Sequence, residues 1–319
     1  MVEAADGSAV REVVTPQPTL ARGKPLWSPD GRRLAYVQYR SGGPGGDLYS
    51  GIWVASLQTS DLRELASTAE LGEEVRLAGW TADSSALFMD FGVRSASISA
   101  DGLAWRLLPI DGPSLDLRAN GGDLPAKTGL TVLTHDDFLV HSPDGSRSVV
   151  VDGGGRFTWT NKRLVLIDSA GAVSSIPLTE PTVAAIAPQW SLDGRSLAYV
   201  AQPAIALAAG FESMAERRIW VIGADGAGNE RLTQNEFAEE WPQWSSAGNH
   251  ILYVRPDAGP SGSSDPRHAS VWLRRLSDGR EQLLVEGVDY YINSIEPRLL
   301  LYMGHYEWGA IIDWWQPPH

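Results

Sequence analysis

The feature that most constrains this chain is a unit that recurs six times along it. In the clearest copies an aromatic residue is followed by Ser-x-Asp-Gly and then by a short apolar run, as in residues 27–37 and 190–200. We call the first residue of each copy its anchor position. The anchor residues are Trp27, Trp80, His141, Trp190, Trp244 and Asn293. Their spacing of about fifty residues indicates a repeat architecture.

Each copy carries further β-rich runs after its anchor. A second run follows a loop of variable length, as in residues 52–54 and 219–222, and a third run follows a turn such as Asp225-Gly226. No window places apolar residues at a helical period. Four short strands in a unit of about fifty residues are typical of a propeller blade. The sequence therefore predicts an all-β fold: a six-bladed β-propeller of four-stranded antiparallel blades, forming one domain over residues 1–319.

The two ends of the chain predict how the ring closes. The last copy reaches His319 soon after its strand at residues 311–315 and lacks an outer strand. A β-rich run at Val10–Val14 precedes the first anchor by nearly the distance that separates an outer strand from the next anchor. We therefore expect this N-terminal strand to complete the last blade. Closure of this kind also removes strand edges that an open array would expose to aggregation.

The repeated residues fit structural roles. Ser-x-Asp-Gly is a turn in which Asp bonds to the backbone ahead of it and Gly supplies a positive φ. The anchor tryptophans fit packing between blades, where each indole N–H finds one partner. The alternatives are metal binding by these aspartates and ligand binding by these tryptophans. Both are weaker readings, and for the aspartates Ala247 and Glu296 break the motif without breaking the repeat.

At Trp27–Gly31, and with His in first place at His141–Gly145, the chain resembles the TolB-type six-bladed propeller family with its Ser-Pro-Asp-Gly repeat. The resemblance covers nearly the whole chain and implies a bacterial, often extracytoplasmic scaffold that binds proteins. TolB has an extra domain before its propeller, and no residues are left here to form one. Similar blades cover the catalytic domain of prolyl-oligopeptidase-like peptidases, but this chain lacks the Gly-x-Ser-x-Gly elbow of such enzymes.

Composition narrows the classes of partner. Lys and Arg number 26 and Asp and Glu number 39, so the net charge of −13 disfavours nucleic acid and anionic membranes. The absence of Cys excludes disulfides, Cys-ligated metals and a thiol nucleophile. Residues 1–20 carry several charges and lack the apolar run of a signal peptide, and no stretch is long and apolar enough to span a bilayer.

Acidic residues recur in the loops that lead into the innermost strands. Three of them lie four residues before an anchor, which predicts equivalent heights around a central channel. Negative charge gathered there would attract a basic peptide or a divalent cation. The alternative is that these are solvated charges of a chain that is acidic throughout. The candidate ligand-binding carboxylates are Asp136, Asp137, Glu239, Glu240 and Asp289.

Long loops between the second and third strands belong to the same predicted face. Trp159 and Trp308 are the candidate ligand contacts there, because aromatic side chains on a rigid scaffold are frequent recognition elements. The alternative role for both is packing over the edge of a blade. Arg residues in the same loops make the face mixed in charge rather than uniformly negative.

No catalytic motif is present, and the six His residues show no metal-binding spacing. The sequence thus predicts a non-enzymatic, monomeric scaffold that recognises a protein or peptide through its loop-rich, partly acidic face, without a cofactor. The resemblance favours an extracytoplasmic location. The alternative is a carbohydrate-binding or metal-dependent carbohydrate-cleaving propeller, with Trp159 and Trp308 as stacking surfaces. Some propeller lyases gather a metal from His residues on separate blades, so a divalent cation in the channel is left open.

Overall fold

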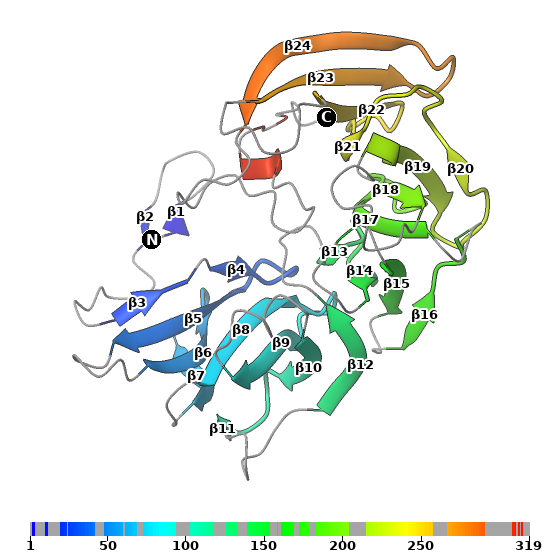
Figure 1. Cartoon of the computed structure of the whole chain (residues 1–319). Coiled ribbons are helices and arrows are strands. Elements are labelled where there is room, and N and C mark those ends of the chain that lie inside the picture. The colour runs from blue at the N-terminus through cyan, green and yellow to red at the C-terminus, as the bar shows by residue number, and fades with distance from the viewer. Residues whose placement is uncertain are drawn as a thin grey trace. The chain divides into compact units, whose positions relative to one another are not determined.

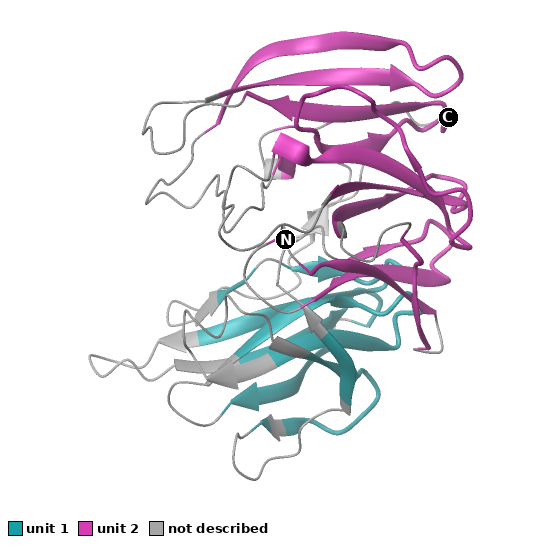
Figure 2. Cartoon of the chain, turned by 45° about the vertical axis from the view of Figure 1, so that its right-hand side comes forward, with its two compact units in different colours: residues 1–134 teal, residues 135–319 magenta. Residues whose placement is uncertain are grey.

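The computed structural model describes two compact units, residues 1–134 and residues 135–319, and each is treated by itself (Figure 2). The described residues are 2–3, 10–11, 20–23, 25–41, 48–59, 61–68, 73–93, 103–117, 126–132, 139–153, 158, 161–168, 172–178, 183–203, 215–257, 267–290, 308–310, 312 and 314. A single domain over residues 1–319 stays a prediction.

Unit 1 contains two large sheets (Figure 1). The first is an antiparallel meander of β5 (Arg33–Ser41), β6 (Leu48–Ser56) and β7 (Leu62–Thr68), in which β3 (Leu20–Arg22) and β4 (Leu26–Trp27) both pair with β5. The second has the order β12-β10-β9-β8. Its strands are β8 (Glu73–Trp80), β9 (Ala86–Val93), β10 (Leu103–Pro109) and β12 (Ala126–Val132).

A short strand of the second repeat joins the first sheet instead of its own. After β10 the chain forms β11 (Leu115–Leu117), which runs parallel to β7. Leu117 is thereby buried in the core that the two sheets share, and the Arg63 guanidinium fixes the crossing by donating to the carbonyls of Ile110 and Gly112. The prediction of purely antiparallel pairing does not hold at this strand, because β11 adds to the edge of the first sheet, where Leu117 is buried, while β12 completes the second sheet beside β10.

The predicted N-terminal closing strand has a local partner in the described residues. β2 (Val10–Arg11) pairs antiparallel with β1 (Val2–Glu3). The remainder of Val10–Val14 and most of residues 311–315 lie outside the described residues. Completion of the last blade by this segment therefore stays a prediction, as does the count of six blades, because most of the sixth copy is outside the described residues as well.

Unit 2 consists of three consecutive four-stranded antiparallel meanders, each in simple chain order (Figure 1). The first contains β13 (Leu139–His141), β14 (Arg147–Asp152), β15 (Arg163–Asp168) and β16 (Val173–Ser175). The second contains β17 (Val183–Trp190), β18 (Ser196–Pro203), β19 (Arg218–Gly223) and β20 (Glu230–Arg231). The third contains β21 (Glu240–Trp244), β22 (His250–Pro256), β23 (Arg267–Arg275) and β24 (Glu281–Tyr290). A 3₁₀ turn, η2 (Trp308–Ala310), follows.

The repeated Ser-x-Asp-Gly segment forms the predicted turn. In the fourth copy the Ser191 hydroxyl donates to Asp193 Oδ1 at 2.7 Å, and Asp193 Oδ1 accepts the backbone N–H of Arg195. Gly194 has a φ of 67°, the left-handed conformation that only Gly adopts without strain. The same bonds recur at Ser28 and Ser142, so this structural role of the motif is confirmed.

Three of the four anchor tryptophans join neighbouring sheets. Each indole N–H donates to the main-chain carbonyl of the residue just before the preceding anchor, from Trp80 to Leu26 at 3.0 Å, from Trp190 to Val140 at 3.3 Å and from Trp244 to Gln189 at 3.1 Å. A ring of this size buries much apolar area, and the hydrogen bond fixes its orientation. The predicted packing role is confirmed for these three residues, whereas Trp27 is 52% exposed and its role stays a prediction.

The described elements are strands apart from short 3₁₀ turns, so the all-β prediction is confirmed, and copies two to five each form a four-stranded antiparallel sheet. The second strand of each sheet supplies the core, as in the buried run Leu197–Ala201. Among the described residues there is no helix long and apolar enough to cross a bilayer.

Candidate functional site

Two of the predicted ligand-binding carboxylates are buried and already paired. Glu240, the first residue of β21, accepts a 2.5 Å hydrogen bond from Arg217, whose guanidinium also reaches the side chains of Gln202 and Thr158. Arg217 is fully buried, so the pair is cut off from solvent. A buried carboxylate with a guanidinium partner is neutralised in place and fixes the strand entrance instead of attracting a ligand.

Glu239 lies in a second buried network beside the first. It accepts a 3.1 Å bond from Arg255 and further bonds from the Thr233 hydroxyl and the Asn235 amide. The Arg255 guanidinium also pairs with Glu281 at 2.8 Å, and these bonds raise the pKa of Arg255 despite its burial. Every oxygen of Glu239 is therefore engaged by the protein itself.

The other predicted site residues divide between exposed, buried and undescribed positions. Asp289 is exposed, lies near the end of β24 rather than in a loop, and contacts His268 at 2.8 Å. Trp308 is only 1% exposed and packs edge-on against Tyr290, with ring centroids 5.1 Å apart. Asp136, Asp137 and Trp159 lie outside the described residues. Their roles, and any role of Asp289 in ligand binding, stay predictions.

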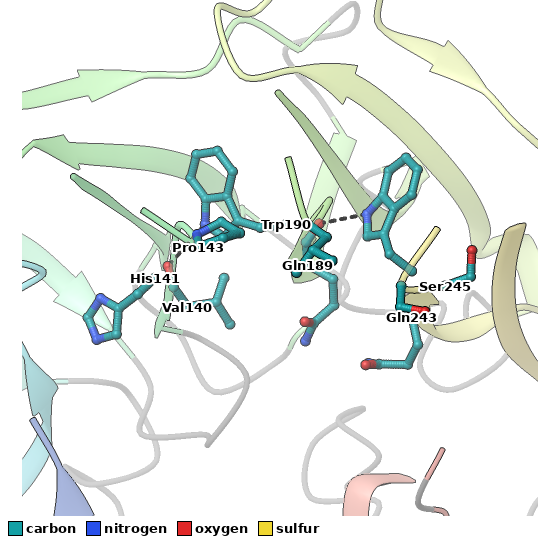
Figure 3. A pocket seen from close by; sticks show the side chains of 10 residues that line it. Val140, His141, Pro143, Gln189, Trp190, Gln243 and Ser245 are labelled. Carbon is teal, nitrogen blue, oxygen red and sulfur yellow. Dashed lines mark hydrogen bonds between the residues drawn. The ribbon is translucent and has the colours of Figure 1, made fainter. Parts of the chain in front are cut away.

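An open pocket of about 300 Å³ lies in unit 2 at the opposite end of the innermost strands from Glu240 (Figure 3). It forms where β13, β17 and β21 end and their turns begin. The volume is at the small end of the range for ligand pockets. Equivalent positions of three successive repeats line it: Val140, His141, Pro143, Gln189, Trp190, Leu192, Gln243, Trp244, Ser245 and Ser246.

Two glutamine amides are the most available polar groups of this pocket. Gln189 and Gln243 occupy the same position in their repeats, immediately before the anchor, and both side chains extend into the open space (Figure 3). Within the described part of the chain, neither amide is hydrogen-bonded to another protein group, and both residues are partly exposed. Each amide thus offers a donor and an acceptor to a ligand.

A strained backbone conformation occurs two residues before each glutamine. The innermost strands β17 and β21 contain bulges between Ile186 and Gln189 and between Glu240 and Gln243. Ala187 has a φ of 49° and Trp241 a φ of 53°, although neither is Gly and each precedes Pro. Such a conformation costs roughly 1–3 kcal/mol at each residue. Bulges re-aim neighbouring side chains, and this one occurs twice at the same place in the repeat.

The lining residues that the structure describes carry no charge. Burial lowers the pKa of His141, whose Nδ1 lies 2.9 Å from the Ser148 hydroxyl, so the imidazole is neutral at neutral pH. No Asp, Glu, Lys or Arg is among the lining residues. In the adjoining turn a hydrogen bond from the Ser142 hydroxyl helps lower the pKa of Asp144 to about 2, but that carboxylate caps its own turn.

The described residues hold no group of three or more His, Asp or Glu side chains that could bind a metal ion. A metal site elsewhere in the chain stays an open alternative, since Asp136 and Asp137 are not described. The pocket itself offers amide, imidazole and hydroxyl groups, which suit hydrogen bonding to a neutral polar ligand better than binding of a hard cation.

The sequence analysis missed these two glutamines although the sequence marks them. Residues 188–191 and 242–245 are both Pro-Gln-Trp-Ser, the longest identical string at the anchors of the fourth and fifth copies. A Trp follows each glutamine, an Asp-Gly turn follows Trp190, and the acidic candidates Glu239 and Glu240 precede Gln243. An alternating strand turns the residue before each anchor away from the anchor's face, and Val140 lines the same pocket from β13, whose pairing with β14 has no bulge.

The comparisons with known proteins bear on the fold of this chain and indicate no activity for it. No protein-family model matches the chain. The uncharacterized protein Atu1656 of Agrobacterium fabrum is 22% identical over 280 residues, covering 77% of this chain and 87% of that protein.

Two solved structures illustrate the likeness. Dipeptidyl peptidase 4 of Porphyromonas gingivalis is 13% identical with a TM-score of 0.52, over 84% of this chain and 39% of that one. TolB of Acinetobacter baumannii is 15% identical with a TM-score of 0.42, over 90% of this chain and 60% of that one. This chain thus spans less than two thirds of the length of either protein. At 13% identity, the likeness to the Porphyromonas gingivalis protein is one of fold alone.

Proposed function

We propose that this chain is a closed six-bladed propeller of the TolB type that works as a non-enzymatic recognition module, and that its unit 2 pocket binds a protein or peptide partner. The observation that carries the proposal is the pair of amides of Gln189 and Gln243, aimed by strained bulges into an open pocket. Repeated strain of this kind is retained where a site needs it.

The proposal moves the binding surface away from the acidic loops. Glu239 and Glu240 form buried ion pairs inside unit 2, so they contribute to stability of the strand entrance. The pocket lies at the other end of the same strands and offers neutral hydrogen-bonding groups instead. Asp136, Asp137 and Trp159 are candidates for a second surface. The resemblance favours an extracytoplasmic location, and a closed ring without a free strand edge favours a monomer.

The carbohydrate alternative is less well supported at Trp308, its predicted stacking residue, and at Trp190, which lines the pocket. Sugar binding by stacking needs an accessible ring face. Trp308 is buried against Tyr290, and Trp190 is 8% exposed with the Arg147 guanidinium over its ring at 5.1 Å from the ring centre. Trp190 therefore presents little free face to a sugar ring.

The experiment is an array of random peptides probed with the labelled full-length protein, in parallel with a glycan array. We expect peptides that bind the wild type and lose at least about tenfold in affinity with Gln189→Ala/Gln243→Ala, since several amide hydrogen bonds are lost. Gln282→Ala, an exposed glutamine in β24, is the matched control and should bind normally. Absence of peptide binding by the folded protein, or glycan binding that the double variant abolishes, would overturn the proposal.

A further inference from the structure

The lining of the pocket restricts the charge of what it binds. Its ten lining residues include two amides, two serines and one imidazole that burial keeps neutral, but no ionised side chain. A carboxylate or ammonium group placed there would lose water without gaining a counter-charge from these lining residues. The Arg147 guanidinium, which lies over the Trp190 ring, already donates to the carbonyls of Gly194 and Ala224. The terminal groups of a peptide are charged at neutral pH, so a chain terminus suits the pocket poorly.

The two amides match the hydrogen-bonding pattern of a peptide main chain. Each Gln side chain carries one carbonyl and one NH₂ group, which can accept from and donate to the same peptide unit. Gln189 and Gln243 occupy equivalent positions on neighbouring sheets, so the repeat presents this pattern twice along the pocket. Main-chain bonds of this kind give affinity for an extended segment and leave its side chains to be read by other groups.

The remaining wall of the pocket is apolar. Leu192 is 59% exposed in the turn after Trp190, and Pro143 is exposed at the equivalent position of the preceding repeat. An aliphatic ligand side chain that covers these two residues would remove apolar surface from water, which is favourable. The pocket therefore combines a polar floor for a main chain with an apolar wall for a side chain.

We infer that the pocket binds an internal, uncharged segment of an extended peptide that carries an aliphatic side chain. Gln189 and Gln243 bond its main chain, and Pro143 and Leu192 contact the aliphatic group. This inference rests on the proposed function, since it specifies which part of a peptide partner the same pocket takes. It excludes a free carboxyl terminus and a free amino terminus as the bound group.

The test is calorimetric titration of the full-length protein with four forms of one tetrapeptide, Ala-Leu-Ala-Leu. The first is acetylated and amidated, the second has a free carboxylate, the third has a free amine, and the fourth is the blocked form with Glu in place of the first Leu. We expect the blocked Leu peptide to bind and each of the other three to bind at least about tenfold more weakly. Gln243→Ala should weaken the blocked peptide by about tenfold, and Gln282→Ala should leave it unchanged.

Three results would overturn the inference. The free-acid or free-amine peptide could bind as tightly as the blocked one, the Glu peptide could bind as tightly as the Leu peptide, or Gln243→Ala could leave all affinities unchanged. If the blocked peptide fails to bind while array peptides still depend on both glutamines, the internal-segment assignment is wrong and the recognition function stands. If no array peptide binds either, both the internal-segment assignment and the proposed recognition function are wrong.

Discussion

The indole nitrogen of Trp244 donates a hydrogen bond of 3.1 Å to the main-chain carbonyl of Gln189, whose side chain lines the pocket (Figure 3). One hydrogen bond thus couples the packing of two neighbouring sheets to the position of a side chain that we propose as a ligand contact. Trp190 makes the same bond to Val140, another lining residue, one sheet earlier. The repeat that builds the fold therefore also builds the pocket.

Replacement of Trp244 by Phe should lower both stability and affinity. The variant removes the donor from the Gln189 carbonyl while keeping an aromatic ring, and loss of such a partner costs about 1–3 kcal/mol in the free energy of unfolding. Urea unfolding and titration with an array-selected peptide measure the two effects. Trp272→Phe is the control, because its indole bonds Ser270 within β23 and its loss should leave peptide affinity unchanged. Equal loss of peptide affinity in Trp244→Phe and Trp272→Phe would contradict a specific coupling between the Trp244 hydrogen bond and the pocket.

The Arg217–Glu240 pair should be among the most sensitive positions in unit 2. Glu240→Gln leaves a fully buried guanidinium without its counter-charge, and breaking a buried pair in this way costs about 3–5 kcal/mol. Asp278→Asn, which removes the half-exposed pair with Arg275, should cost no more than about 1 kcal/mol. Chemical unfolding of both variants measures the two losses in the free energy of unfolding. A cost for Glu240→Gln no larger than for Asp278→Asn would show that the buried pair is not a stabilising contact.

Periodicity and turn residues were sufficient to predict most of the fold. The Ser-x-Asp-Gly turns and the apolar runs after them are local features, and each appears in the structure where the sequence placed it. The pairing of β11 with the first sheet was not predictable, because Leu115–Leu117 has the same local sequence pattern whichever sheet it joins. That choice depends on which core has room for Leu117.

The candidate site was harder to predict than the fold. Glu239 and Glu240 look like solvated loop charges in the sequence, and their burial depends on Arg255 and Arg217, which lie 16 and 23 positions away along the chain. Gln189 follows a bulge that shifts the register at Ala187, and a bulge leaves no periodic trace in the sequence. Recurrence of Pro-Gln-Trp-Ser was the one available clue.

At Ala187, substitution by Gly should destabilise the protein less than substitution by Val, which is the reverse of the order expected at an ordinary strand residue. With a φ of 49°, its backbone accommodates Gly without strain, so Ala187→Gly should change the free energy of unfolding by less than about 1 kcal/mol. Ala187→Val should cost more than about 2 kcal/mol, because a β-branched side chain is strongly disfavoured in this region. Ala185→Gly, at a buried position of the same strand, should cost about 1–2 kcal/mol. Ala187→Gly more damaging than Ala185→Gly would refute the strain argument.

Closure of the proposed ring predicts a particular role for Trp27. Trp80 is 1% exposed and bonds the Leu26 carbonyl, whereas Trp27 is 52% exposed in the structure. In a closed ring the Trp27 indole would bond the sheet of the last copy as the other anchors bond their neighbours. Trp27→Phe and Trp80→Phe should then destabilise the protein similarly, by about 1–2 kcal/mol. A cost below about 0.5 kcal/mol for Trp27→Phe alone would count against closure.

Buried Lys162 should make stability rise with pH in the mildly alkaline range. Burial lowers the pKa of Lys162 from 10.5 to about 8, against the opposing charge of Asp152. Between these two values the unfolded chain binds more protons than the folded one, so the free energy of unfolding increases with pH. From about pH 7.5 to 9.5 the gain is about 2 kcal/mol.

Lys162→Met should remove this slope and be the more stable protein at about pH 7.5, because Asp152 keeps its 2.6 Å pair with Arg163. Lys127→Met, at an exposed lysine, should keep the slope. Urea unfolding at several pH values below 10 measures it, since raised tyrosine pKa values such as that of Tyr199 oppose it above that point. Persistence of the slope in Lys162→Met would mean that another group carries the proton, and the assignment to this lysine would be wrong.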